Sequence, residues 1–248
     1  MNLGKASLSV LFSVFVSTAA FAVPAGLVPS MVALDRKYIP ALGLSGQADQ
    51  QAKARIAFAA FERAWKDFER DFSAGPGLDA EWQEDLEAVD LAVLKARTAL
   101  MDASDGPAAH EALEAVRMTF LESRTRQKIP YFIDSLTLFH NSMEDLLNAK
   151  PAKDLKDWSV NEKMGFAADL DVSVARWKKV KAMEGLLPDA SLGAKAGDAY
   201  SAQWRAIDTV MAGAKQAFEA GDGKALSEKL GQLKPNFIKT FFLFGDFQ

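Results

Sequence analysis

Cysteine is absent from all 248 residues of the chain, and this absence excludes several classes of protein. A chain without cysteine has no disulfide bond, no thiolate metal site, no covalent haem of the Cys-x-x-Cys-His type and no iron–sulfur cluster. Histidine is scarce too, with two residues in the whole chain. Any site that needs an imidazole ligand must therefore use one of these two residues.

Recognisable catalytic motifs are also missing. The sequence contains no Gly-x-Ser-x-Gly elbow, no glycine-rich phosphate loop and no recognisable acid–base pair in either half. The formal net charge of −4 disfavours binding to nucleic acid, which proteins recognise mainly through clustered basic residues. We therefore predict that the protein is not an enzyme and that it does not bind nucleic acid.

The first 22 residues have the pattern of a secretory signal peptide. Lys5 is the only charged residue before Asp35, an apolar run extends from Ala6 to Phe21, and Ala20-Phe21-Ala22 is a small-x-small cleavage site. We predict cleavage after Ala22 and a periplasmic mature protein. No later stretch supplies the roughly 20 consecutive apolar residues that a membrane-spanning helix needs, so we expect no span in the mature chain.

Most of the remaining sequence has apolar residues at spacings of three and four, which is typical of helices that bury one face. Alternating strand patterns of useful length are absent, so the predicted fold is all-α, with seven to eight antiparallel amphipathic helices. Helices should begin near Pro107 and Pro130, and at the capping box formed by residues 159–162. The segment 29–44 is less regular because Pro40 interrupts it, and it is either a further helix or an extended arm. The two clearest stripes are Phe58, Phe61, Trp65, Phe68 and Phe72, and then Trp82, Leu86, Val89, Val93, Ala96 and Leu100.

The two halves of the chain also resemble each other. A shift of 118 residues places Leu86, Val89, Val93, Ala96 and Leu100 over Trp204, Ile207, Met211, Ala214 and Phe218. A shift of 117 places Asp105-Gly106 over Asp222-Gly223, and a shift of 112 places Trp65 over Trp177. We interpret the chain as two tandem pseudo-repeats of a helical bundle, covering residues 23–128 and 129–248 after the leader at 1–22.

Both histidines fall in the region 110–144, and each is followed four residues later by a glutamate. This spacing places His110 with Glu114, and His140 with Glu144, on one face of their helices. If a turn near 128–129 pairs these helices antiparallel, Arg117 should lie opposite His140. The two histidines would then be offset by about 10 Å along the hairpin, too far apart to ligate one ion together.

Three interpretations of this cluster stay open. In the first, His140 is a partly buried residue whose imidazole pairs with Glu144 and Arg117, with no ligand. In the second, Glu114, His140 and Glu144 bind a divalent transition metal, with His110, Arg117, Met118 and Met143 around the site. In the third, His140 and either Met118 or Met143 hold a non-covalent haem b.

Phenylalanine is abundant, with 17 residues against 3 tyrosines, and it is concentrated near the C-terminus. Phe237, Phe241 and Phe244 fit one helical stripe and should be core. Phe242 and Phe247 fall off this stripe and could form an exposed contact surface for a periplasmic partner protein. From the sequence we therefore predict an exported binding or scaffold protein, with metal or haem binding in the 110–144 region as the alternative.

Overall fold

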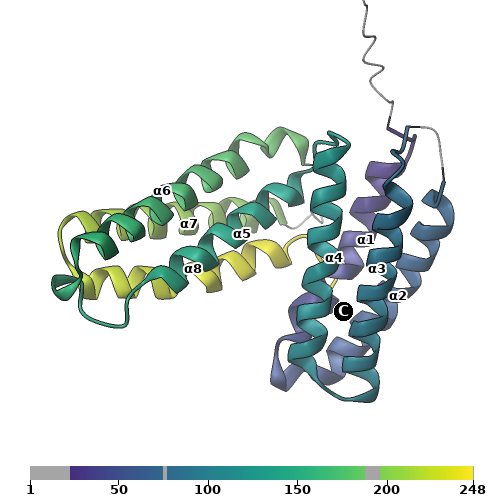
Figure 1. The fold of residues 1–248 in the computed structure, drawn as a ribbon, viewed down its shortest axis with the longest axis horizontal. Helices are drawn as coiled ribbons and strands as arrows, with labels where there is room; N and C mark the ends of the chain where they lie inside the picture. The colour runs from purple at the N-terminus through teal and green to yellow at the C-terminus, as the bar shows by residue number, and fades with distance from the viewer. Residues whose placement is uncertain (1–22, 75–76, 188–195, 248) are drawn as a thin grey trace, which may run out of the picture.

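The computed structural model describes residues 23–74, 77–187 and 196–247, and these residues form eight α-helices and no strand (Figure 1). The predicted all-α fold is therefore confirmed. The predicted signal peptide lies outside the described residues. Of the helices that are described, none combines the length and apolar character needed to cross a membrane.

The helices form two groups of four, which meet at an angle (Figure 1). Within each group, sequence neighbours pack as pairs, α1 with α2, α3 with α4, α5 with α6 and α7 with α8. The first group contains α1 (Leu27–Ser45), α2 (Gln51–Phe72), α3 (Trp82–Arg97) and α4 (Gly106–Arg126). The second contains α5 (Phe132–Ala149), α6 (Val160–Ala182), α7 (Ala196–Glu219) and α8 (Gly223–Phe242).

The predicted stripes form the core of each bundle. Phe58, Phe61, Trp65 and Phe68 of α2 are buried, as are all six residues of the stripe from Trp82 to Leu100. The indole Nε1 atoms of Trp65 and Trp177 each donate a hydrogen bond to an aspartate on a neighbouring helix, Asp90 at 2.6 Å and Asp208 at 2.8 Å. A buried indole needs such an acceptor, because an unpaired donor in the core costs free energy.

The capping box predicted at 159–162 is present at the start of α6. The Ser159 hydroxyl accepts from the Glu162 N–H, and the Glu162 carboxylate accepts from the Ser159 N–H. The fourth predicted helix, by contrast, begins at Phe132 and not at Pro130. Tyr131 is the residue before this helix; its backbone is extended at φ −142°, and its hydroxyl donates to Asp35 at 2.5 Å.

Residues 29–44 belong to a helix, so the alternative of an extended arm is wrong. Pro40 lies inside α1 and cannot donate the N–H that the carbonyl of Arg36 would normally accept. The C-terminal segment replaces that donor, since the backbone N–H of Asp246 lies 2.8 Å from the Arg36 oxygen. The Asp246 carboxylate also pairs with the side chains of Arg36 and Lys37, at 2.6 and 3.1 Å. The end of the chain therefore completes the first helix.

A polar cluster joins the two bundles where the chain passes from α4 to α5. The guanidinium of Arg124 is almost fully buried and forms a two-pronged ion pair with Asp134, with Nη2–Oδ1 at 2.5 Å and Nε–Oδ2 at 2.9 Å. The same guanidinium lies 4.4 Å from the centre of the Tyr131 ring, and Tyr131 donates to Asp35. These four residues come from α1, α4, the connection and α5, so the cluster links the two bundles.

The two bundles share local details that the sequence alignment places in register. Asp105 and Asp222 both cap the helix that follows, each accepting a hydrogen bond at 3.0 Å from the backbone N–H three residues on. The residue before each cap has a left-handed backbone, Ser104 at φ 58° and Gly221 at φ 71°. Gly221 adopts this conformation at little cost, whereas a serine is strained there. Duplication itself stays a prediction.

Candidate functional site

The largest concave feature involving the predicted site residues is a cleft of about 880 Å³ where the bundles meet. The C-terminal end of α1 and one face of α4 form one side, and α5 with the second half of α8 form the other (Figure 1). This volume is within the range of sites that hold drug-sized molecules. The apolar lining consists of Leu42, Pro107, Pro235, Phe237, Ile238, Phe241 and Phe242; the polar lining includes Gln47, His110, Glu114, Arg117, His140, Glu144, Lys234 and Lys239.

Arg117 is the central polar residue of this cleft. Its side chain is 5% exposed, it pairs with Glu114 one turn earlier on α4, and its Nη2 lies 3.1 Å from Nδ1 of His140. The contact with His140 is the pairing that the antiparallel register predicts. The axis of α5 then diverges from α4 into the second bundle (Figure 1), so the two helices pack together over only part of the predicted hairpin.

His140 is held as a neutral imidazole by its surroundings. Burial lowers its pKa, and the positive charge of Arg117 lowers it further, against the smaller opposing effects of Glu114 and Glu144. Because the Arg117 guanidinium can only donate, Nδ1 must be the acceptor, which assigns the ring proton to Nε2. Nε2 lies 3.6 Å from the Glu144 carboxylate, and the ring packs on Phe237 with centroids 5.0 Å apart.

His110 occupies the other end of the cleft and has different partners. Its Nδ1 lies 2.9 Å from the backbone oxygen of Leu42, so this nitrogen donates and the contact joins α4 to the end of α1. Its Nε2 lies 3.7 Å from Glu114. The two histidines therefore share the cleft but each binds a separate set of neighbours.

The predicted metal ligands Glu114, His140 and Glu144 all line the cleft. Glu114 pairs with Arg117, and Glu144 pairs with Lys234 at 2.8 Å, so both carboxylates already have cationic partners. Within the described residues, no three His, Asp or Glu side chains are grouped so that they could hold one ion.

The haem hypothesis fits the geometry poorly as well. The sulfur of Met118 lies 3.6 Å from the Asn141 amide nitrogen, and Met143 is fully buried in the core of the second bundle. Neither methionine is among the residues that line the cleft with His140. A haem in this cleft would therefore have no methionine as its second axial ligand.

The predicted contact surface at the C-terminus is divided between two environments. Phe242 is half-buried, lines the cleft and covers Gly43 so closely that a Cβ atom there would collide with the ring. Phe247 packs against Phe242 with ring centroids 4.5 Å apart and is 40% exposed. Phe237, Phe241 and Phe244 are buried, as predicted for core residues.

Sequence reasoning missed Lys234 and the contribution of α1 to the site. One signal was available, because the 117-residue shift places Arg117 over Lys234 and Phe120 over Phe237. Arg117 and Lys234 both line the cleft, and each pairs with one of its glutamates. Leu42 reaches the cleft only because of the way the two bundles dock, and a local sequence pattern cannot predict that docking.

Comparison with known proteins gives no functional assignment: no family model, no characterised protein and no solved structure matches this chain.

Proposed function

We propose that this chain is an exported binding protein that holds a small amphipathic molecule in the cleft between its bundles. The observation that supports this most directly is the lining of the cleft. Leucine, isoleucine and phenylalanine side chains supply its apolar surface, and a small group of polar side chains gathers around Arg117, which contacts Glu114 and His140. Concave sites with a mainly apolar surface and a few convergent polar groups are typical of small-molecule binding.

Apolar side chains at the cleft also supply the driving force for binding. Ile238 is 37% exposed and Phe242 is half-buried, so both present surface that a ligand would remove from water. Each 100 Å² of apolar surface buried contributes about 2.5 kcal/mol before the entropic cost of association is subtracted. The predicted leader at 1–22 supports export, and the net charge of −4 is compatible with a soluble carrier.

A neutral environment-sensitive dye, N-phenyl-1-naphthylamine, tests the proposal without assuming a charged ligand. Protein purified after expression of the full chain should bind one dye molecule, with increased and blue-shifted emission. Ile238→Glu should weaken binding at least about tenfold, because it places a carboxylate in the apolar wall. Val172→Glu is the matched control, since Val172 is 50% exposed on α6 and lines none of the described cavities.

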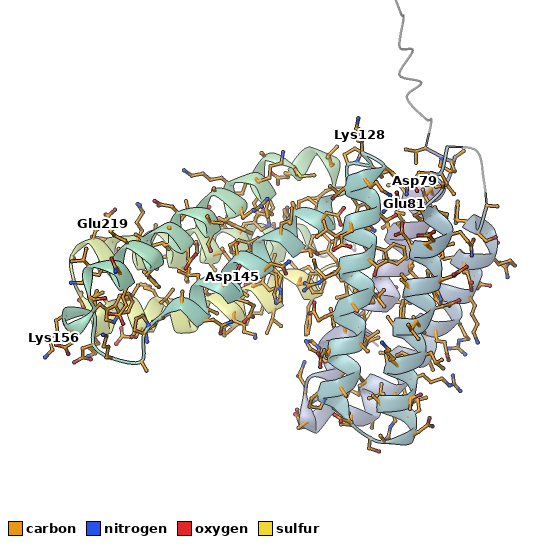
Figure 2. The ribbon with its side chains drawn as sticks, viewed as in Figure 1. Asp79, Glu81, Lys128, Asp145, Lys156 and Glu219 are labelled. Carbon is orange, nitrogen blue, oxygen red and sulfur yellow. The ribbon has the colours of Figure 1, made fainter. Side chains whose placement is uncertain are left out.

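The competing location is a shallower apolar groove of about 550 Å³ at the far end of the second bundle. It lies beside Lys156 and Glu219, which Figure 2 shows at the end remote from the first bundle. Val160 and Met164 line it and are 72% and 66% exposed. Dye binding that is unchanged in Ile238→Glu but lost in Met164→Glu would contradict our proposal and place binding at this groove.

Transition-metal binding is the second candidate, supported by the distance of 3.6 Å between His140 Nε2 and Glu144 and by Glu114, which pairs with the same Arg117 that contacts His140. A metal would have to displace Arg117 or Lys234 from those carboxylates. If it does, zinc should raise the melting temperature and His140→Ala should abolish the increase, because a ligand specific to the folded state stabilises it by mass action. No binding tighter than about 100 μM would exclude this candidate.

We also propose that the two bundles arose by duplication. The matching Asp105 and Asp222 caps, the left-handed residue before each cap and the equivalent Trp–Asp hydrogen bonds support this origin. His110, by contrast, aligns with Ser227, and Glu114 with Gly231. Under this proposal each bundle does not carry its own copy of the cleft, because the cleft forms once, between a face of the first bundle and a face of the second.

A further inference from the structure

The side chains of the cleft carry an excess of positive charge. Three fixed cations line it, Arg117, Lys234 and Lys239, against the two carboxylates of Glu114 and Glu144. His140 adds no charge near neutral pH, because burial and Arg117 lower its pKa. Glu114 and Glu144 are already paired, whereas Lys239 has no acidic partner within ion-pair distance in the described part of the chain. An anionic group entering the cleft would therefore meet a cation that is not yet neutralised.

Arg117 provides an independent indication. Its side chain is 5% exposed, and its Nε atom is buried with no hydrogen-bond acceptor. The two contacts that it makes, to Glu114 and His140, both use Nη2. A buried donor without an acceptor costs free energy, and an oxygen acceptor near the guanidinium would remove that cost. A ligand with an acidic oxygen pair supplies such an acceptor, and guanidinium groups bind carboxylates with particular strength.

The face of α8 that lines the cleft changes from polar to apolar toward the C-terminal end of the helix. Lys234, Ile238 and Phe242 follow one another at intervals of four residues, so they lie along one face of the helix. The cation of Lys234 is therefore separated from the Phe242 ring by about 12 Å along the helix axis. Glu144 pairs with Lys234 and lies beside His140, which contacts Arg117, so these residues are at the Lys234 end of the cleft. Gly43 and its neighbour Leu42 are at the Phe242 end.

We infer that the cleft binds an amphiphile with a single anionic head, of the medium-chain carboxylate class. Its head lies toward Lys234 and Arg117, and its chain runs along Ile238 to Phe242. This inference rests on the proposed function, since it specifies the chemical class of the molecule in the same cleft. Head and chain are recognised by different residues, so their contributions can be measured separately.

Displacement of the neutral dye by three ten-carbon probes tests the charge. Decanoate, 1-decanol and decylamine have the same chain with an anionic, a neutral and a cationic head. Decanoate should displace the dye at a concentration at least about fivefold lower than decanol does, and decylamine should be the weakest. Increasing salt should reduce the advantage of decanoate, because screening weakens exposed charge interactions.

Lysine variants identify the head-binding end. Lys234→Gln should weaken decanoate binding about threefold to tenfold, and Lys239→Gln should weaken it less, because Lys239 lies about 7.5 Å from Lys234 along the helix axis toward Phe242; neither variant should change decanol binding. Lys224→Gln is the matched control, since this exposed lysine is on the same helix about 15 Å from Lys234 along its axis and does not line the cleft. Decanoate binding should be unchanged in that control.

Two results would overturn the inference and leave the proposed function intact. One is dye displacement by decanoate and decanol at equal concentrations, or more effectively by decylamine. The other is a preference for decanoate that persists in both Lys234→Gln and Lys239→Gln. If the dye itself does not bind, or binds equally well to Ile238→Glu, the proposed function fails and the inference fails with it.

Discussion

Asp35 should make the stability of this protein depend on pH in the acidic range. Its carboxylate lies at the junction of the bundles, where it accepts a hydrogen bond from Tyr131 and faces Arg124 and Asp134. Burial raises its pKa from 3.8 to about 6, although Arg124 and the Tyr131 hydroxyl act in the opposite direction. The folded state therefore binds a proton at Asp35 under conditions in which the unfolded chain has already released it.

The sign and size of the effect follow from proton linkage. Between pH 3.8 and about 6 the folded state binds more protons at this position, so the free energy of unfolding decreases as pH rises through this window. A pKa raised from 3.8 to about 6 corresponds to about 3 kcal/mol, at about 1.36 kcal/mol for each tenfold change in proton affinity. Since Asp35 as a residue is partly exposed, screening by solvent reduces our expectation to about 1–3 kcal/mol.

Asp35→Asn tests this expectation, because an asparagine oxygen can still accept from Tyr131 while the charge is removed. Urea unfolding at pH 7 should show the variant to be more stable than the wild type by about 1–3 kcal/mol, with the gap closing by pH 4. Asp49→Asn is the control, since Asp49 is exposed and accepts from its neighbour Gln50. A difference between Asp35→Asn and the wild type that is equal at pH 4 and pH 7 would refute the reasoning.

Three further predictions concern stability and can be measured by urea unfolding at pH 7. Asp134→Ala should destabilise the protein by about 3–5 kcal/mol, because it leaves the buried Arg124 guanidinium unpaired; a loss below about 1 kcal/mol would show that this ion pair does not hold the junction. Trp65→Ala and Trp177→Ala should each cost about 3–5 kcal/mol, since both indoles are buried and hydrogen-bonded; a much smaller loss at either would contradict their equivalence as core anchors. Ser159→Ala should cost about 1 kcal/mol by removing the cap of α6, and no loss would mean that the cap is dispensable.

Much of the fold was predictable because each helix carries its own signal. The stripe from Trp82 to Leu100 and the Ser159 capping box depend on residues close together in sequence, and both predictions are confirmed. The same reasoning could not decide whether the segment around Pro40 is helical. The donor that satisfies the Arg36 carbonyl is the backbone N–H of Asp246, some two hundred residues away. A local sequence pattern cannot predict a hydrogen bond between residues so far apart in the chain.

The candidate site was predictable only in part, for the same physical reason. The pairing of Arg117 with His140 follows from an antiparallel turn between adjacent helices, and the structure contains it. Lys234 and Leu42 come from helices far away in the sequence, and they reach the cleft because the bundles dock at an angle. Lys234 also changes the chemistry expected of Glu144, since it supplies a cation where the sequence suggested a metal ion.

The most direct test of the account is a methyl chemical-shift titration with decanoate, using protein labelled at isoleucine, leucine and valine methyl groups. We predict saturable shifts at Ile238 and Leu42, which line the cleft from opposite bundles, with a common dissociation constant. The methyl groups of Val160, in the groove at the far end of the second bundle, should not move. Shifts confined to Val160, or no saturable shift at Ile238 and Leu42, would contradict the claim that the cleft between the bundles is a binding site.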